Sequence, residues 1–294
     1  DGKDPFISFR VLARETKTIK MGPIAVSPFE LHPIKMAASL LTLNEISGGR
    51  AVIVVGGGGG TVDAMGLKPE KRMPAMRECI DILRAAAQGQ LVDYHGAIDT
   101  SRRFEPIWVT QSPPQIYVGA NKKTVMAFGS EVGDGIMMSD IPRPIVADYI
   151  AATHARLDAL GKPKADFAMN NFFAWHVKED REAAWREAAR WLVLRGMLFP
   201  MYLRPFLEED EVKLVRENIG AFFRAYHRNT HMIENVPEDI VSRLIDGLTL
   251  WGGLEDIDRI VEELKDFERK GLNEIALRIY DDPAGCIRLI GERI

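Results

Sequence analysis

An apolar segment followed by a run of glycines constrains the fold of this chain more than any other feature of its sequence. The four residues from Val52 to Val55 are all apolar, which is typical of a strand buried on both faces of a parallel sheet. Five glycines, Gly56 to Gly60, follow directly and let a ligand lie against the backbone, because they have no Cβ atoms. Ligands bind at the carboxyl ends of strands in parallel α/β folds. We therefore expect a site here for a sizeable, phosphorylated small molecule.

Predicted strands and helices alternate along the whole chain, which indicates an α/β fold with a parallel sheet. Both an open doubly wound sheet and a (β/α)8 barrel fit this order. A barrel needs eight strands, and the sequence begins at Asp1, without methionine, directly before a helical pattern. We therefore expect a first β-α-β segment to be missing from this chain. The six predicted strands are residues 17–26, 51–55, 115–118, 135–138, 167–177 and 274–280.

Between these strands the sequence predicts helices, an irregular excursion at residues 89–114, and helical fragments at 200–236 that are rich in aromatic and charged residues. No change in composition divides the chain, so we expect a single domain over residues 1–294. The expected helices cover residues 5–16, 33–46, 72–87, 144–160, 179–198 and 256–270, with a further helix after Asn121.

Composition excludes several classes of protein. The net charge of −4 is spread over 294 residues, so no basic face indicates a nucleic-acid partner, and no apolar run is long enough for a membrane span. Two distant cysteines, Cys79 and Cys286, predict reduced thiols in a cytoplasmic protein. His227 and His231 have the i, i+4 spacing of metal ligands on a helix, but no third ligand accompanies them, so we predict no metal site.

The glycine run does not match the common nucleotide-binding motifs. A dinucleotide fingerprint needs Gly-x-Gly-x-x-Gly or a final Ala, and the three possible registers end instead at Thr61, Val62 and Asp63. The Gly-Lys-Ser/Thr of a P-loop is also absent. A Rossmann NAD-dependent dehydrogenase and a merely flexible glycine loop remain as alternatives.

The sequence resembles the luciferase-like flavin-dependent oxidoreductases over nearly its whole length, except for residues 200–236. Within that family, residues 18–29 and 43–52 most resemble the methylenetetrahydromethanopterin reductases, which use a deazaflavin. The matching segments are Asp4-Pro5-Phe6, residues 18–22, His32-Pro33, residues 43–50 with the glycines after Val55, residues 72–83, 116–120, 133–135 and 270–275.

The resemblance implies a (β/α)8 TIM-type barrel with FMN or coenzyme F420 at the carboxyl mouth of its strands. In the family, the strand matching residues 17–26 ends in a bulge behind the flavin ring, often with a non-prolyl cis peptide. Ile24, Ala25 and Val26 occupy that place. Gly56, Gly57 and Gly58 would line the ring or the ribityl chain. The family's phosphate loop matches Gly119, Ala120, Asn121 and Lys122, where backbone N–H groups at a helix start bind the phosphate.

Substrate contacts are expected from the second half of the chain. Asn170 and Trp175 lie on a long strand near the barrel mouth, and strand alternation would place Asn170 and Asn171 on opposite faces. His227 falls in residues 200–236, which we interpret as a variable helical insertion and lid over the substrate. Catalytic residues are not identified, since a flavin carries most of the chemistry of hydride transfer itself.

We therefore predict a flavin- or deazaflavin-dependent oxidoreductase that transfers hydride between its cofactor and a small organic substrate. With FMN it would instead activate oxygen as a monooxygenase, with a separate flavin reductase as a partner. An acid often follows the glycines in deazaflavin-using members of the family, but this chain has Gly59 and Gly60. Family habit implies a homodimer. A non-catalytic flavin-binding barrel remains an alternative.

Overall fold

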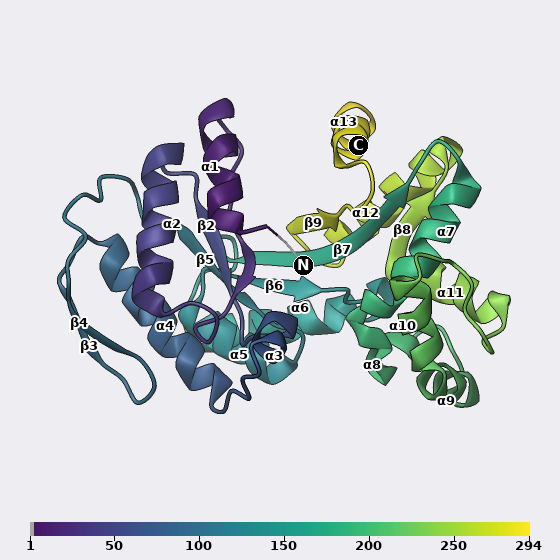
Figure 1. The fold of residues 1–294 in the computed structure, drawn as a ribbon, viewed down its shortest axis with the longest axis horizontal. Helices are drawn as coiled ribbons and strands as arrows, with labels where there is room; N and C mark the ends of the chain where they lie inside the picture. The colour runs from purple at the N-terminus through teal and green to yellow at the C-terminus, as the bar shows by residue number, and fades with distance from the viewer. Residues whose placement is uncertain (1–2) are drawn as a thin grey trace. The chain divides into compact units, whose positions relative to one another are not determined.

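The computed structural model describes residues 3–294, whose contacts divide into two compact units (Figure 1). Unit 1 comprises residues up to Met137 together with Thr153–Ala168, and unit 2 comprises Met138–Ala152 and Met169–Ile294. The chain passes from unit 1 to unit 2 within strand β6 (Gly135–Ser139) and returns within helix α6 (Arg143–Ala159).

A parallel sheet forms the core of unit 1, as the sequence predicts. Its strands β1 (Ile24–Val26), β2 (Val52–Val55), β5 (Gln115–Gly119) and β6 are neighbours in that order. Ile53, Val55 and Val118 are fully buried, which agrees with a sheet covered on both faces. The predicted strand at residues 17–26 is shorter in the structure, because only an isolated bridge between Met21 and Ala51 precedes β1.

The helices of unit 1 follow the predicted pattern, except for the short α3 (Gly60–Ala64), which was not predicted. Helix α2 (Pro33–Ser47) begins with the His32 imidazole accepting a hydrogen bond from the Ile34 N–H, and it ends at Gly48 with φ of 68°. Its residues Met36 and Leu40 are buried as expected. The remaining helices are α1 (Pro5–Glu15), α4 (Arg72–Ala87) and α5 (Lys123–Val132).

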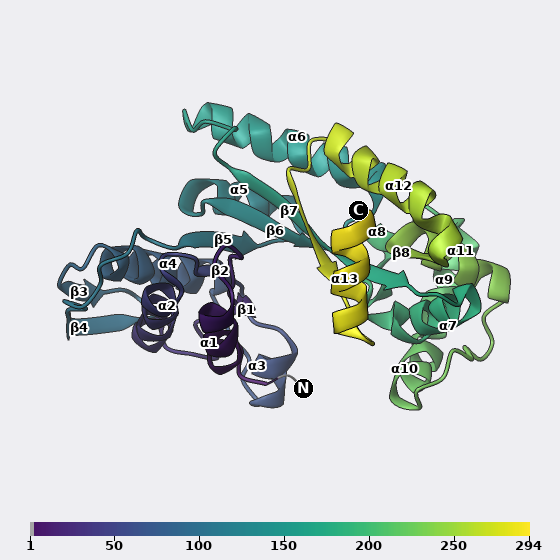
Figure 2. The same ribbon diagram turned by 90° about the horizontal axis from the view of Figure 1, so that it is seen from above.

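Residues 89–114 were predicted to be irregular, and this prediction is wrong for two short strands within them. Strands β3 (Val92–His95) and β4 (Thr100–Phe104) form an antiparallel hairpin on the outer side of α2 and α4 (Figure 2). The Glu78 carboxylate of α4 accepts hydrogen bonds from the backbone N–H groups of Ala97, Ile98 and Asp99 at 2.7–3.0 Å. A side chain distant in sequence therefore stabilises the turn, which local propensity alone does not indicate.

In unit 2, the long strand β7 (Ala168–Val177) pairs in parallel with β8 (Thr249–Gly252) and β9 (Glu274–Arg278). Strand β9 is one of the predicted strands, whereas β8 was not predicted. Strand β8 is too short to show a clear alternation of apolar and polar residues, and it directly follows α11 (Glu238–Leu248).

The two faces of β7 differ in their surroundings. Phe173 packs edge-on against Phe267 of α12 (Ile257–Arg269), with ring centroids 5.2 Å apart. Since strand side chains alternate, Asn171 and Trp175 share this helix-covered face. Asn170 and His176 lie on the other face.

The predicted helix at residues 179–198 is shorter than expected. Helix α7 (Arg181–Trp191) gives way to two short 3₁₀ turns, Leu192–Leu194 and Gly196–Leu198, in which Gly196, Met197 and Leu198 have positive φ. The predicted helical fragments follow as α8 (Pro200–Leu203), α9 (Glu209–Glu217) and α10 (Ile219–His227), and the chain ends with α13 (Pro283–Arg293). Among residues 3–294, no helix combines the length and the apolar character needed to cross a membrane.

Candidate functional site

The carboxyl ends of β1, β2 and β5 meet in unit 1 and bring the predicted cofactor-binding segments together. The backbone N–H of Gly56 donates to the Val26 carbonyl at 3.0 Å. A Cβ placed on Gly119 would lie 3.8 Å from the Gly56 Cα. Three segments that are far apart in the sequence thus form one surface, which we call the backbone cradle: Ile24–Val26, Gly56–Gly58 and Gly119–Lys122.

The first side of the backbone cradle has the backbone geometry that the family resemblance implies. The Ile24–Ala25 peptide bond is cis, and the pairing of β1 with β2 shifts register between Ile24 and Val26. Val26 is buried, but the side chain of Ile24 is 48% exposed although it sits at a strand end in the sheet. An exposed apolar side chain at this edge offers a surface on which a flat ring can lie.

The glycine tract divides into a tightly packed part and an open part. A Cβ on Gly56 would lie 3.1 Å from the Ala25 Cβ, and one on Gly58 would lie 2.7 Å from the Val62 Cγ2. Gly58 also has φ of +85°, a conformation that favours glycine. By contrast, Gly60 begins α3, and a Cβ there would meet no atom within 4 Å. A side chain would therefore be resisted at Gly56 and Gly58, whereas one at Gly57 would make ordinary contacts with Arg72 at 3.5 Å.

Arg72 is a site residue that the sequence analysis missed. Its Nη1 donates to the carbonyl oxygens of Gly57 at 2.9 Å and of Gly58 at 2.6 Å. The guanidinium therefore fixes the direction of two consecutive peptide groups in the backbone cradle. Arg72 was expected as the first residue of a helix and as part of the matching segment 72–83, and no local signal shows that this helix start lies beside the glycines.

The predicted phosphate loop differs in one detail from the expectation. The Ala120 N–H donates to the Met137 carbonyl at 3.0 Å, so the sheet already uses this donor. Lys122 precedes α5 with an extended backbone and an exposed side chain, and it makes no side-chain cap on the helix. The first N–H groups of α5 and the Lys122 ammonium are thus the better placed groups for an anion.

A second group of polar side chains lies in unit 2, on the face of β7 that carries Asn170. The Asn170 amide donates to the Glu274 carboxylate at 3.1 Å. Nearer the carboxyl ends, His176 stacks on Tyr280 with ring centroids 5.3 Å apart and planes at 2°. Between these pairs, Arg278 stands opposite Ala174 in the strand register. We call this surface the polar face of β7.

The three predicted substrate residues are not brought together. Asn170 lies on the polar face of β7, but Trp175 is five residues further on and points to the opposite face, where it is 1% exposed. His227 is exposed at the end of α10, with its ring 5.0 Å from that of Tyr226. Because α10 ends at His227, His231 does not share a helix face with it and instead packs against Trp185.

A buried ion pair closes the carboxyl end of the polar face. Asp140 directly follows β6 with φ of 58°, and its carboxylate accepts from the Arg195 Nη1 at 2.8 Å. Arg195 is fully buried and also bonds the Tyr280 hydroxyl. No sequence pattern points to either member, because 55 residues separate them and neither belongs to a motif.

The ring of His176 is held by a second buried network. Its Nδ1 lies 3.2 Å from the Glu187 carboxylate, which also pairs with Lys178. Complete burial lowers the pKa of His176, so the imidazole is neutral near pH 7. Burial alone would raise the pKa of Glu187, but the hydrogen bonds from His176 and Lys178 hold it below its usual range. The His176 Nε2 is buried without a hydrogen-bond partner.

Comparison with known proteins gives consistent matches. The model of a family described as luciferase-like monooxygenase matches residues 2–274. A 5,10-methylenetetrahydromethanopterin reductase of Archaeoglobus fulgidus is 29% identical, over 100% of this chain and 87% of that protein.

Two solved structures show the fold. A coenzyme F420-dependent tetrahydromethanopterin reductase from Methanopyrus kandleri has a TM-score of 0.81 at 19% identity, over 100% of this chain and 87% of the other. A monooxygenase from Streptomyces bottropensis has a TM-score of 0.67 at 18% identity, over 99% and 82% of the two chains. These proteins are TIM-type barrels, in agreement with the predicted fold class.

Proposed function

The chain belongs to the luciferase-like monooxygenase family, and from this premise we propose that it is an oxidoreductase that uses coenzyme F420 or FMN. The observation that carries the proposal is the backbone cradle, where three strand ends meet and glycine keeps side chains away from the backbone. Such a surface suits a flat, extended ligand better than it suits a small ion or a peptide.

The residues of the backbone cradle fit a flavin or a deazaflavin. The exposed Ile24 side chain and the glycine backbone from Gly56 to Gly58 offer an apolar floor for the ring system. At the other end, Lys122 and the start of α5 offer positive charge for a phosphate. Arg72 would keep the glycine loop in one conformation before the cofactor binds, which lowers the entropy cost of binding.

We propose reduction of a methylene group on a reduced pterin as the reaction, using coenzyme F420. The support is the methylenetetrahydromethanopterin reductase that matches the whole chain. When bound, the deazaflavin supplies the hydride. The chain's own part is to orient the ring on the backbone cradle and to hold the substrate against it, which is most of what a cofactor enzyme contributes.

A second candidate is an FMN-dependent monooxygenase supplied by a separate flavin reductase. Gly59 and Gly60 favour it, because the resemblance associates an acid after the glycines with deazaflavin use. The similarity to a monooxygenase structure agrees with this candidate in fold. A cytoplasmic location, which the two distant cysteines suggest, belongs to both candidates.

We further propose that residues 200–236 act as the lid of a single barrel domain over residues 1–294. Exposed apolar side chains lie within this segment and directly before it, with Met232 at 66% and Phe199 at 52% exposure. The Cζ of Arg216 lies 5.2 Å from the centroid of the Phe199 ring. Apolar side chains on a segment of this kind can cover a substrate and exclude water.

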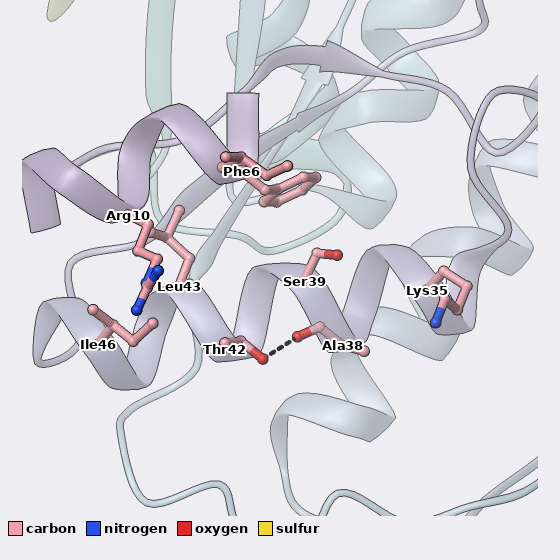
Figure 3. A pocket seen from close by; sticks show the side chains of 9 residues that line it. Phe6, Arg10, Lys35, Ala38, Ser39, Thr42, Leu43 and Ile46 are labelled. Atoms are coloured by element: carbon pink, nitrogen blue, oxygen red, sulfur yellow. Dashed lines mark hydrogen bonds between the residues drawn. The ribbon is translucent and has the colours of Figure 1, made fainter. Parts of the chain in front are cut away.

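We propose that the enzyme is a homodimer, with the α1–α2 face as the contact surface. Figure 3 shows Phe6 and Arg10 of α1 above a hollow bounded by Thr42, Leu43 and Ile46 of α2. Beside it, Ile7 is 73% and Val11 is 63% exposed. Sedimentation of the wild-type chain and of an Ile7→Lys, Val11→Lys variant tests this, since a dimer formed through this face should dissociate in the variant.

Stopped-flow oxidation of the bound, reduced cofactor tests the activity. We expect methylenetetrahydromethanopterin to accelerate the anaerobic oxidation of reduced coenzyme F420 on the enzyme. If reduced FMN instead reacts rapidly with oxygen on the protein, the monooxygenase candidate holds. A cofactor that binds but is not oxidised faster with any substrate or with oxygen would indicate a non-catalytic flavin-binding barrel. Binding of NAD(H) alone would contradict the proposed use of a flavin or deazaflavin.

A further inference from the structure

We propose that Arg278 binds an oxyanion, a carboxylate or a phosphate, of the substrate that this enzyme acts on. The identity of that group as part of a substrate rests on the proposed function, but the anion site itself does not. It follows from the position, the packing and the charge of the polar face of β7.

Arg278 is the last residue of β9 and stands opposite Ala174 of β7 in a parallel register. It therefore lies on the same face as Asn170 and His176, at the carboxyl end of the strands. That end is where parallel α/β folds bind their ligands. The face opposite to it is covered by α12 through the contact of Phe173 with Phe267.

The guanidinium of Arg278 is held in place but still reaches solvent. Its Cζ lies 4.0 Å from the centroid of the Phe172 ring, and its Nη2 lies 3.4 Å from the Ser139 Oγ. The side chain remains 22% exposed. An arginine fixed in this way by an aromatic ring loses little further freedom when it binds an anion, so more of the interaction energy appears as affinity.

The charge of Arg278 is not balanced by its acidic neighbour. Asp140 lies 3.9 Å from the Arg278 Nη1. Its carboxylate already accepts from the Arg195 Nη1 at 2.8 Å, the Ser139 hydroxyl at 3.0 Å and the Gly196 N–H at 3.3 Å. Two guanidinium groups therefore share one carboxylate, which leaves one positive charge in excess.

The other titratable groups around this cluster do not remove that excess. Glu187 is compensated by Lys178, and burial keeps His176 neutral. Glu274 is four residues earlier on β9, about 13 Å along a strand, and it accepts from Asn170. A positive charge in a partly buried setting attracts an anion much more strongly than the same charge in water does. The planar guanidinium also matches the geometry of a carboxylate or a phosphate.

Calorimetric titration of the full chain at low ionic strength tests the inference with two probes, inorganic phosphate and glutarate. The variants are Arg278→Met, Arg278→Lys and the control Arg288→Met, which removes the same charge from an exposed position on α13. We expect Arg278→Met to weaken the binding of at least one probe by about tenfold, the effect of losing a charged hydrogen bond. Arg288→Met should bind as the wild type does.

The probe that loses more affinity identifies the anion as a phosphate or a carboxylate. Unchanged binding in Arg278→Met, an equal loss in Arg288→Met, or wild-type protein that binds neither probe would each overturn the inference. If Arg278→Met is unstable by thermal denaturation, Arg278→Lys decides, since it keeps the charge and must retain measurable binding. No cofactor or turnover enters the titration, so failure here is distinct from failure of the proposed oxidoreductase activity.

Discussion

The strand ends of unit 1 and the strand ends of unit 2 differ in the chemical groups that they present. In unit 1 the backbone cradle is built mainly of peptide groups and small residues, and the neighbouring cation Arg72 bonds its carbonyl oxygens. In unit 2 the strand ends carry a network of buried charged side chains around Asp140 and Arg195. A surface made of backbone is disrupted by added atoms, whereas a network of charges is disrupted by the loss of one member. The two regions should therefore respond to opposite kinds of substitution.

Removing one member of the buried ion pair should have the largest effect. Arg195→Met leaves the Asp140 carboxylate buried beside Arg278 only, and we expect the free energy of unfolding to fall by about 3–5 kcal/mol. The matched control is Arg204→Met, which removes an exposed partner of Glu209 and should lower the free energy of unfolding far less, because solvent screens an exposed ion pair. Urea denaturation of both variants measures the difference. If both variants lose the same free energy of unfolding, the buried pair of Asp140 with Arg195 contributes no more than an exposed one.

Adding one methyl group to the backbone cradle should come next. Gly58→Ala forces a Cβ to within 2.7 Å of Val62 at a positive φ, and we expect it to cost about 1–3 kcal/mol of stability. Gly60→Ala, at an open position on a helix, should be neutral or slightly stabilising. Thermal denaturation of the pair checks this, and a destabilised Gly60→Ala would contradict the division of the tract.

The buried His176 predicts a pH dependence of stability that belongs to unit 2. The folded state keeps this imidazole neutral, whereas the unfolded chain takes up a proton below about pH 6.5. The free energy of unfolding should therefore fall as the pH decreases from about 6.5, by up to about 1.4 kcal/mol per pH unit.

The test for His176 is denaturation between pH 7.5 and 5 of the wild type, His176→Asn and the control His227→Asn. The slope with pH should be smaller in His176→Asn and unchanged in His227→Asn, because His227 is exposed on α10. His154, whose pKa burial also lowers, contributes to the same pH range in all three proteins. An unchanged slope in His176→Asn would mean that its imidazole is already charged in the folded protein.

Loosening the backbone cradle without adding atoms should have the smallest effect on stability. Arg72→Met removes two hydrogen bonds at an exposed position, and we expect stability to change by less than about 1 kcal/mol. Cofactor affinity should still fall by about tenfold, since the glycine carbonyls are no longer fixed. Arg77→Met on the same helix is the control, since it loses a pair with Glu131 and a contact with the Phe128 ring but no bond to the glycines. If Arg72→Met and Arg77→Met bind the cofactor with equal affinity, Arg72 has no role in cofactor binding.

The sequence predicted unit 1 better than unit 2, for a physical reason. An apolar strand followed by glycine is a local signal, so the neighbourhood of Gly56 was found together with the segments at Ile24 and Gly119 that the family resemblance supplied. The pair of Asp140 with Arg195 joins a strand end to a segment 55 residues away, and neither residue carries a pattern of its own. Such contacts depend on tertiary packing, which periodicity does not report.

Trp175 and His227 were both predicted beside the substrate with Asn170, and the structure places them elsewhere. The odd spacing of Asn170 and Trp175 on one strand already places them on opposite faces, so their separation follows from alternation alone. The helix α10 ends at His227, and Asn229 follows it with φ of 55°. Asparagine is a recognised stop signal at this position, and it argues against a helix that continues from His227 to His231.

The most direct measurement of the central claim is an absorbance titration of the full-length protein with FMN and with coenzyme F420. It is carried out on the wild type, Gly58→Ala and Gly60→Ala. We predict tight binding of one of the two cofactors by the wild type and by Gly60→Ala, and a loss of about tenfold or more in Gly58→Ala, where the added methyl group displaces the loop. Tight binding of neither cofactor by the wild type, or undiminished binding by Gly58→Ala, would contradict the account.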